Sequence, residues 1–238
     1  MSTPILSVII VAAGKGSRFR QSAGASFAEV KKPFVPLAGK PLFLHSVERF
    51  AAMPEVGEQI LVVAPEDRER VAAACGGELR RWGVTLADGG KERFDSVRGG
   101  LAALEGDFPF VAIHDAARPC FTADLARRVL HAAELIGGAI PASRSTATIK
   151  RGTDDSSEEF PLIRQTVPRR TLWEAETPQI FRLDLYRQAA ERYGSSEVTD
   201  DAALFERAGL PVALVESDHK NPKITTAWDL SIAGMILG

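Results

Sequence analysis

The sequence predicts an α/β fold, with a doubly wound, mostly parallel, Rossmann-like sheet and helices on both faces. Three observations support this prediction. Short apolar runs alternate with segments of helical spacing along most of the chain, as in a parallel sheet with crossover helices. The first run, residues 8–11, is apolar at every position, as expected of a strand buried on both faces. Glycine-rich polar segments follow several runs, at the sheet edge where such folds bind ligands.

The strands are predicted from short runs that are rich in β-branched residues and bounded by turn residues. In chain order, these runs occupy residues 8–11, 59–64, 84–87, 108–113, 138–141, 179–181 and 212–216. A chain of 238 residues is long enough for one domain, 1–238, built on a single sheet of this kind.

The helices are predicted from apolar residues at helical spacing. In chain order, they span 42–53, 65–75, a segment ending at 104, 122–135, 183–193, 200–208 and 226–237. Pro54 stops the first, Pro65 starts the second and the pair Gly76–Gly77 ends it. Thr122 is placed to cap the fourth at its N-terminus.

One segment departs from the alternation and predicts a β-hairpin arm inserted at about 143–170. Two β-prone stretches, 147–151 and 162–167, flank the polar loop 152–159. A lone two-stranded hairpin is only marginally stable in water, so the arm needs a partner. We expect that partner to be the same arm of a second subunit, in a twofold homodimer.

The turn after the first strand, Ala12-Ala13-Gly14-Lys15-Gly16-Ser17, predicts a phosphate site. Its two glycines let the backbone approach a bound group, and cations follow it at Arg18, Arg20, Lys31 and Lys32. The phosphate loop of ATPases is excluded because Phe19 stands where its second glycine belongs. The same residue replaces the third glycine of the dinucleotide fingerprint, which disfavours an NAD-dependent oxidoreductase. A solvated loop with several lysines remains the alternative.

Composition limits the partners. The formal net charge of −2 gives no whole-surface attraction to nucleic acid or to an anionic membrane. Cys75 and Cys120 are far apart in sequence and predict neither a disulfide framework nor a zinc site. The first residues carry no basic leader, and the apolar run at 8–11 is too short to cross a membrane. We therefore expect a cytoplasmic protein that binds no nucleic acid and no membrane.

Three polar motifs, AAGKGSR, DGGKERFDS and HDAARP, follow the first, third and fourth strands. The carboxyl ends of parallel strands share one sheet edge, so these motifs predict a single site. Together with TPQIF, TDDA and NPKIT further along, they resemble the 2-C-methyl-D-erythritol 4-phosphate cytidylyltransferases of the nucleotidyltransferase superfamily. The resemblance implies transfer of CMP from CTP to that polyol phosphate in isoprenoid precursor biosynthesis, with release of pyrophosphate and with Mg²⁺ as cofactor.

The resemblance also implies roles for particular residues. Those bordering the nucleotide would be Ala12, Ala13, Gly14, Lys15, Gly16, Gly90 and Ser96. The catalytic cations would be Arg18, Lys32, Arg169 and Lys223, of which the last two surround the acceptor phosphate. The acceptor would be bound by Asp115, Arg118, Thr148 and Thr199. Asp115 would also be the metal ligand.

Several alternatives stay open on the sequence. The segment Lys31-Lys32-Pro33 departs from the family pattern, so Lys31 could replace Lys32 as the catalytic lysine. Ser96 could instead be a helix N-cap, and Arg93 is expected to pair with Asp95 or Glu92 on a solvated helix face. The acceptor could be another polyol phosphate, such as ribitol 5-phosphate. A catalytically silent nucleotide-binding paralogue is the alternative from a different class.

Overall fold

The computed structural model describes residues 3–22, 27, 30–153, 159–194, 198–218 and 220–238. Its centre is an eight-stranded sheet in the order β10-β7-β11-β6-β1-β4-β5, with β12 beside β7. These strands are β1 (Leu6–Val11), β4 (Val56–Val63), β5 (Val84–Asp88), β6 (Phe110–Asp115), β7 (Gly138–Arg144), β10 (Trp173–Ala175), β11 (Gln179–Arg182) and β12 (Ala213–Glu216). Parallel pairs join β5, β4, β1 and β6, whereas β11 runs antiparallel to both its neighbours. The predicted mostly parallel sheet is confirmed.

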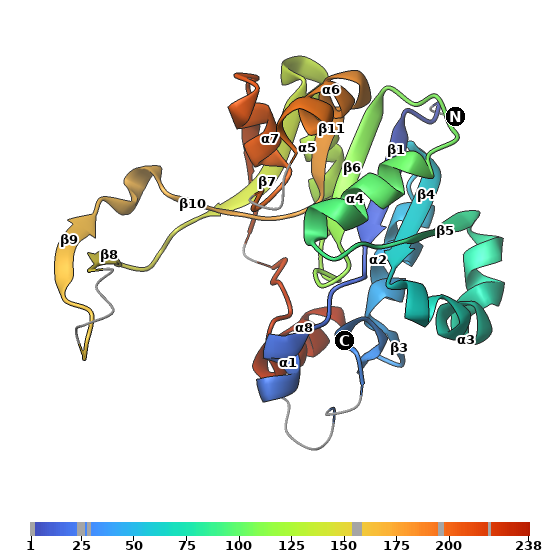
Figure 1. Cartoon of the computed structure of the whole chain (residues 1–238), viewed down its shortest axis with the longest axis horizontal. Coiled ribbons are helices and arrows are strands. Elements are labelled where there is room, and N and C mark those ends of the chain that lie inside the picture. The colour runs from blue at the N-terminus through green and yellow to red at the C-terminus, as the bar shows by residue number, and fades with distance from the viewer. Residues whose placement is uncertain (1–2, 23–26, 28–29, 154–158, 195–197, 219) are drawn as a thin grey trace.

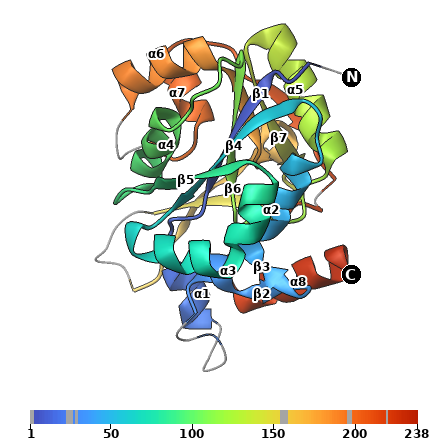
Figure 2. The ribbon, with the colours of Figure 1, turned by 90° about the vertical axis from the view of Figure 1, so that its right-hand side faces the viewer.

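Helices cover both faces of this sheet (Figure 1; Figure 2). They are α1 (Ser17–Ser22), α2 (Leu42–Ala51), α3 (Arg68–Arg81), α4 (Arg93–Ala102), α5 (Ala123–Ile136), α6 (Leu183–Tyr193), α7 (Ala202–Arg207) and α8 (Ala227–Leu237). Alternate residues of β1 enter two cores: Val8 and Ile10 pack in the core with α2, α3 and α5, and Ile9 in the core with α4, α6 and α7. This is why the first apolar run has no polar alternation.

A third, smaller core packs α1 and α8 against each other, below the sheet in the view of Figure 1. Phe19 of α1 is almost fully buried there, with Leu42, Ile224 and Ala233. The residue that excludes a dinucleotide turn is therefore a core residue. Among the described residues, the single-turn helices η2 (Lys32–Phe34) and η3 (Pro65–Asp67) and a short hairpin of β2 (Pro36–Leu37) and β3 (Lys40–Pro41) complete the body, whereas η4 (Arg169–Thr171) lies on the arm.

The predicted arm is present and projects from the body (Figure 1). Its strands β8 (Ile149–Gly152) and β9 (Ile163–Val167) form a separate antiparallel pair. Phe160, Leu162 and Ile163 on it are more than half exposed. Residues 154–158 of the predicted loop lie outside the described part of the chain. Within that part, no helix is long and apolar enough to span a bilayer.

The predicted end of a helix at Gly76–Gly77 is wrong, because α3 continues through both glycines to Arg81. Cys75 and Leu79, four residues apart, are both buried in the core that α3 covers. Burial of Leu79, one turn beyond Cys75, outweighs the cost of two glycines inside a helix, about 1 kcal/mol each.

Gly77→Ala is expected to stabilise the protein by about 0.5–1 kcal/mol, because an exposed mid-helix glycine costs unfolded-chain entropy. A Cβ at position 77 would meet nothing within 4 Å. Urea unfolding gives the difference. Gly83→Ala is the matched control: its surroundings are equally open, but its φ is +62°. That substitution should cost about 1 kcal/mol, and equal effects at the two positions would contradict the explanation.

Candidate active site

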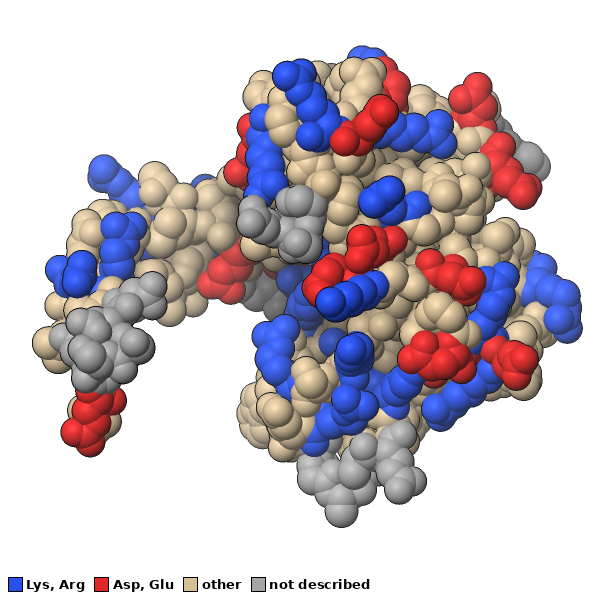
Figure 3. Space-filling model, viewed as in Figure 1, with Lys and Arg blue, Asp and Glu red and all other residues tan. Residues whose placement is uncertain are grey.

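A pocket of about 430 Å³ opens at the carboxyl ends of β1, β5 and β6. The predicted site residues that line it are Ala12, Ala13, Gly14, Lys15, Lys32, Gly90, Ser96, Asp115 and Lys223. They come from the three predicted strand-end motifs, from η2 and from the segment before α8. On the face shown in Figure 3, Lys and Arg side chains gather over α1 and toward α3. The topology thus brings together most of the residues predicted to bind the nucleotide.

The wall expected to border the base is made by two closely packed turns. A Cβ at Gly89 would lie 2.3 Å from Ala13 Cβ, and one at Gly90 would lie 2.3 Å from Asp95 Cβ. Ser96 is not the N-cap of α4, because Glu92 precedes the helix in that position. The Ser96 hydroxyl instead accepts a hydrogen bond from Gly90 N (3.2 Å) and donates one to Glu92 O (3.3 Å). Ser96 therefore holds the glycine turn against the start of the helix.

The two adjacent lysines point to different surroundings. Lys31 Nζ lies 2.9 Å from Glu66 Oε1 and 2.8 Å from Asp67 Oδ2, outside the pocket lining. Lys32 lines the pocket, and its Nζ donates to Ile224 O at 3.0 Å. Burial, and then the nearby positive charge of Lys223, lower the pKa of Lys32 to about 8. Of the two, Lys32 is thus the lysine that faces the pocket.

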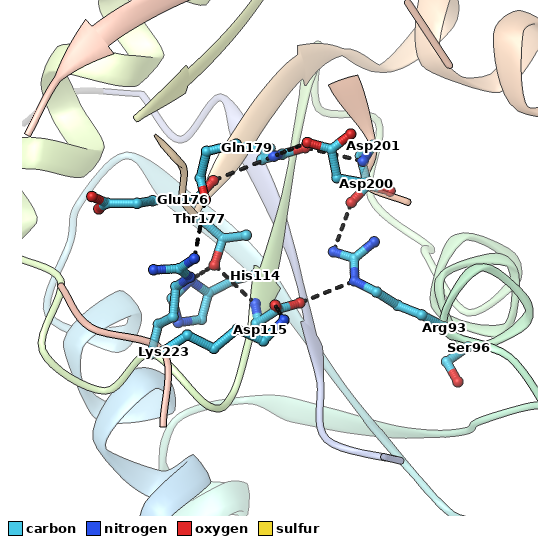
Figure 4. A network of polar contacts seen from close by, with 12 residues as sticks. Arg93, Ser96, His114, Asp115, Glu176, Thr177, Gln179, Asp200, Asp201 and Lys223 are labelled. Atoms are coloured by element: carbon cyan, nitrogen blue, oxygen red, sulfur yellow. Dashed lines mark hydrogen bonds and ion pairs between the residues drawn. The ribbon is translucent and has the colours of Figure 1, made fainter. Parts of the chain in front are cut away.

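Asp115, the last residue of β6, holds two cations at the centre of the pocket (Figure 4). Its Oδ1 accepts from Arg93 Nε at 3.1 Å, and its Oδ2 accepts from Lys223 Nζ at 2.6 Å. Burial alone would raise the pKa of Asp115, but the charges of Arg93 and Lys223 outweigh it and hold that pKa well below its usual range. The carboxylate is therefore ionised at neutral pH.

The expectation that Arg93 pairs with Asp95 or Glu92 on a solvated face is wrong. Arg93 lines the pocket and bridges Asp115 and Asp201, since its Nη2 lies 2.8 Å from Asp201 Oδ2. The reason is tertiary: α4 starts beside the end of β6, so the first side chain of the helix reaches buried carboxylates.

Sequence reasoning also missed the polar layer behind the pocket. The backbone N–H of Asp115 donates to Thr177 Oγ1 at 3.1 Å, and that hydroxyl bonds His114 Nδ1 at 3.1 Å. Burial lowers the pKa of His114 to about 3, so its ring is neutral. Gln179 binds the turn before α7 through its side-chain amide (Figure 4). The motifs TPQIF and TDDA contain several of these residues, but neither spacing nor composition indicates that they meet.

Six predicted residues lie outside the pocket lining: Arg18, Gly16, Arg118, Thr148, Arg169 and Thr199. Arg118 binds two main-chain carbonyls, Asn221 O at 2.8 Å and Ala175 O at 3.0 Å. Thr148 and Arg169 are exposed at the base of the arm, where Arg169 donates to Thr146 O. One chain therefore does not bring the predicted arm residues to its own pocket.

The chemistry of the donor set fits Mg²⁺ only together with a phosphate ligand. Within the described residues, no group of three or more His, Cys, Asp or Glu side chains could hold a metal ion. Asp115 is a single carboxylate deep in the pocket, and Mg²⁺ is commonly bound by one or two carboxylates plus substrate phosphates. Asp115 could supply such an oxygen beside its contacts with Arg93 and Lys223.

Comparison with known proteins identifies the family of the chain. The family model described as 2-C-methyl-D-erythritol 4-phosphate cytidylyltransferase matches residues 6–238. The protein of that name from Endomicrobium trichonymphae is 38% identical over 231 residues, covering 97% of this chain and 98% of its own. A bifunctional enzyme IspD/IspF from Rhodospirillum rubrum is 41% identical over 229 residues, but this chain spans only 56% of its length.

Solved structures give the same result. The 4-diphosphocytidyl-2C-methyl-D-erythritol synthase of Anaerococcus prevotii matches with a TM-score of 0.80 and 27% identity, covering 98% of this chain and 96% of its own. The 2-C-methyl-D-erythritol 4-phosphate cytidylyltransferase of Thermus thermophilus matches with a TM-score of 0.73 and 28% identity, covering 96% and 97%. The family indicated by the sequence motifs is confirmed, and the chain belongs to the 2-C-methyl-D-erythritol 4-phosphate cytidylyltransferases.

Proposed function

We propose that the pocket holds CTP against the glycine turns and that the acceptor phosphate enters beside Lys32, Lys223 and Asp115. Family membership makes the chain a nucleotidyltransferase that transfers the cytidylyl group of CTP to 2-C-methyl-D-erythritol 4-phosphate. The products are 4-diphosphocytidyl-2-C-methyl-D-erythritol and pyrophosphate. The convergence of Lys32 and Lys223 on one pocket supports the proposed roles most directly.

The reaction needs alignment and charge neutralisation rather than a general base. The acceptor phosphate is already anionic, so one of its oxygens attacks the α-phosphorus of CTP while the bond to the pyrophosphate oxygen breaks. Negative charge grows on the phosphorus oxygens and on the leaving group, and fixed cations stabilise it. We assign this role to Lys32 and Lys223 in the pocket, with Lys15 and Arg18 binding the triphosphate. Mg²⁺ at Asp115 would neutralise further charge on the triphosphate.

The same proposal includes a homodimer. The arm carries exposed apolar side chains on an isolated strand pair, and such a pair is marginal in water. A second arm in a twofold dimer would cover it and would bring Arg169 and Thr148 toward the partner's pocket. The cytoplasmic location and the absence of nucleic-acid and membrane partners remain predictions.

The test is pyrophosphate release from CTP with 2-C-methyl-D-erythritol 4-phosphate, with ribitol 5-phosphate and without acceptor, each with Mg²⁺ and with EDTA. We expect release to require methylerythritol phosphate and to stop with EDTA. We also predict that ATP and GTP react poorly, because we expect the turns at Gly90 and Ser96 to leave pyrimidine-sized room. A preference for ribitol phosphate would identify the other polyol cytidylyltransferase. CTP binding with no turnover would identify a silent paralogue.

The value of kcat/KM is expected to fall as pH rises through about 8. The protonated Lys32 carries the useful charge, and its pKa of about 8 means that this form dominates below that pH and is lost above it. The loss should approach tenfold for each further pH unit. Bound triphosphate favours the protonated lysine, so the fall in kcat should appear at higher pH. A flat kcat/KM profile from pH 7 to 9.5 would contradict the assignment.

A further inference from the structure

Asp201 is a fully buried carboxylate behind the pocket. Its Oδ1 accepts a 2.5 Å hydrogen bond from the Tyr186 hydroxyl. Its Oδ2 lies 2.8 Å from Arg93 Nη2 but makes no hydrogen bond of good geometry. A buried carboxylate is stable only with a compensating charge, and Arg93 provides it. The carboxylate therefore holds the guanidinium from the side away from the pocket.

Arg93 connects Asp201 to the pocket, because its guanidinium contacts the carboxylates of both Asp201 and Asp115 (Figure 4). The guanidinium is a planar, rigid fork, so anchoring one nitrogen fixes the direction of the others. With Nη2 held at Asp201, Nε meets Asp115 Oδ1 at 3.1 Å. That contact leaves Asp115 Oδ2 facing Lys223 Nζ. Asp201 is absent from the pocket lining, so a residue behind the pocket is connected through Arg93 to the Asp115–Lys223 pair.

The same carboxylate belongs to the turn that carries Thr199. The backbone N–H groups of Asp201 and Ala202 donate to Gln179 Oε1 at 3.1 and 3.0 Å, and Gln179 Nε2 donates to Asp200 Oδ2 at 3.0 Å. Thr199 directly precedes these acidic residues. The Asp201–Arg93 pair thus joins two acceptor-side elements, the end of β6 and the turn before α7.

We propose that Asp201 is a positioning residue that acts through Arg93 to set Asp115, Lys223 and the Thr199 turn for the acceptor polyol phosphate. The inference rests on the proposed function and assigns the pair to the acceptor side rather than to CTP. The glycine turns that border the base are held by other contacts, those of Ser96 with Gly90 and Glu92.

The first experiment compares Asp201→Asn and Arg93→Met with wild-type enzyme in pyrophosphate release and in CTP calorimetry. We expect the KM for methylerythritol phosphate to rise at least about tenfold in each. The Kd for CTP, measured without Mg²⁺ because Asp115 would also hold the metal, should stay within about twofold. Arg93→Lys should resemble Arg93→Met, because a single ammonium cannot bridge both carboxylates. The matched control is Arg98→Met, an exposed arginine on the same helix, which should leave KM, Kd and melting temperature unchanged.

The double variant Arg93→Met/Asp201→Asn separates positioning from stability. Arg93→Met alone leaves a buried charge unpaired and should lower the melting temperature, and adding Asp201→Asn should recover much of it. The acceptor KM should stay high in the double variant, because the guanidinium is still missing. Recovery of KM together with melting temperature would show a merely structural pair and overturn the inference.

A fall in CTP affinity as large as the rise in acceptor KM would also overturn the inference, because the Asp201–Arg93 pair would then support the whole pocket. An active wild-type enzyme whose variants keep their acceptor KM would refute the positioning role alone. A wild-type protein that releases no pyrophosphate with this acceptor would refute the proposed function, and the inference with it. The wild-type measurement therefore distinguishes the two failures.

Discussion

Replacing Lys32 by alanine is expected to lower kcat roughly a hundredfold, about 3 kcal/mol, while the Kd for CTP changes far less. Charge on the phosphorus oxygens and the leaving group grows only as the bond to pyrophosphate breaks, so a cation fixed there contributes mostly in the transition state. Lys32 is fixed by its hydrogen bond to Ile224 O and faces the pocket with Lys223. Single-turnover kinetics with CTP calorimetry separates the two effects.

Lys31→Ala is the matched control, since it removes the same charge one residue away. Lys31 is held by Glu66 and Asp67 outside the pocket lining, and a surface ion pair of this kind contributes at most about 1 kcal/mol of stability. We expect its kcat to stay within about threefold of wild type. A damaging Lys31→Ala with a mild Lys32→Ala would show that the loop is arranged differently during catalysis.

Two inactive variants, Lys32→Ala and Arg169→Ala, are expected to restore activity when their subunits are mixed. Arg169 sits at the base of the arm and does not line its own chain's pocket, which supports a role across a twofold interface. In a mixed dimer of that kind, one site carries both lesions and the other carries neither. Random pairing makes about half the dimers mixed, so about a quarter of all sites should be active.

The control for this experiment is proof of exchange, for example by mass spectrometry of subunits with two different tags. Each variant dissociated and reassociated alone should stay inactive. No recovery despite exchange would mean that Arg169 serves its own subunit's site. A chain that remains monomeric at micromolar concentration would remove both the dimer and the shared site from the proposal.

Local sequence patterns predicted the fold and much of the pocket lining. An apolar run without polar alternation, such as Val8 to Val11, indicates a strand whose two faces are both buried. The parallel order of strands then places the turn at Gly14, the turn at Gly90 and Asp115 on one edge. All three line the pocket. For these residues, position follows from the parallel order of the strands. That order is predicted by the local alternation of strands and helices along the chain.

Tertiary contacts decided the surroundings of residues that local sequence could not tell apart. Lys31 and Lys32 have the same charge and the same loop, and only the placement of Glu66, Asp67 and Ile224 separates them. Arg93 could have paired within its own helix, but the buried carboxylates of Asp115 and Asp201 compete more strongly. A charge in a low-dielectric interior gains more from a counter-ion than an exposed carboxylate does in water.

The sequence by itself therefore determined the sheet, the edge at which the pocket opens and the family. The tertiary structure alone decided which lysine lines the pocket and where α3 ends. It also decided that Arg93 joins the buried carboxylates of Asp115 and Asp201. The physical reason is the range of the interactions. Strand and turn formation depend on residues a few positions apart, whereas burial and charge compensation depend on residues such as Arg93 and Asp201, which only folding brings together.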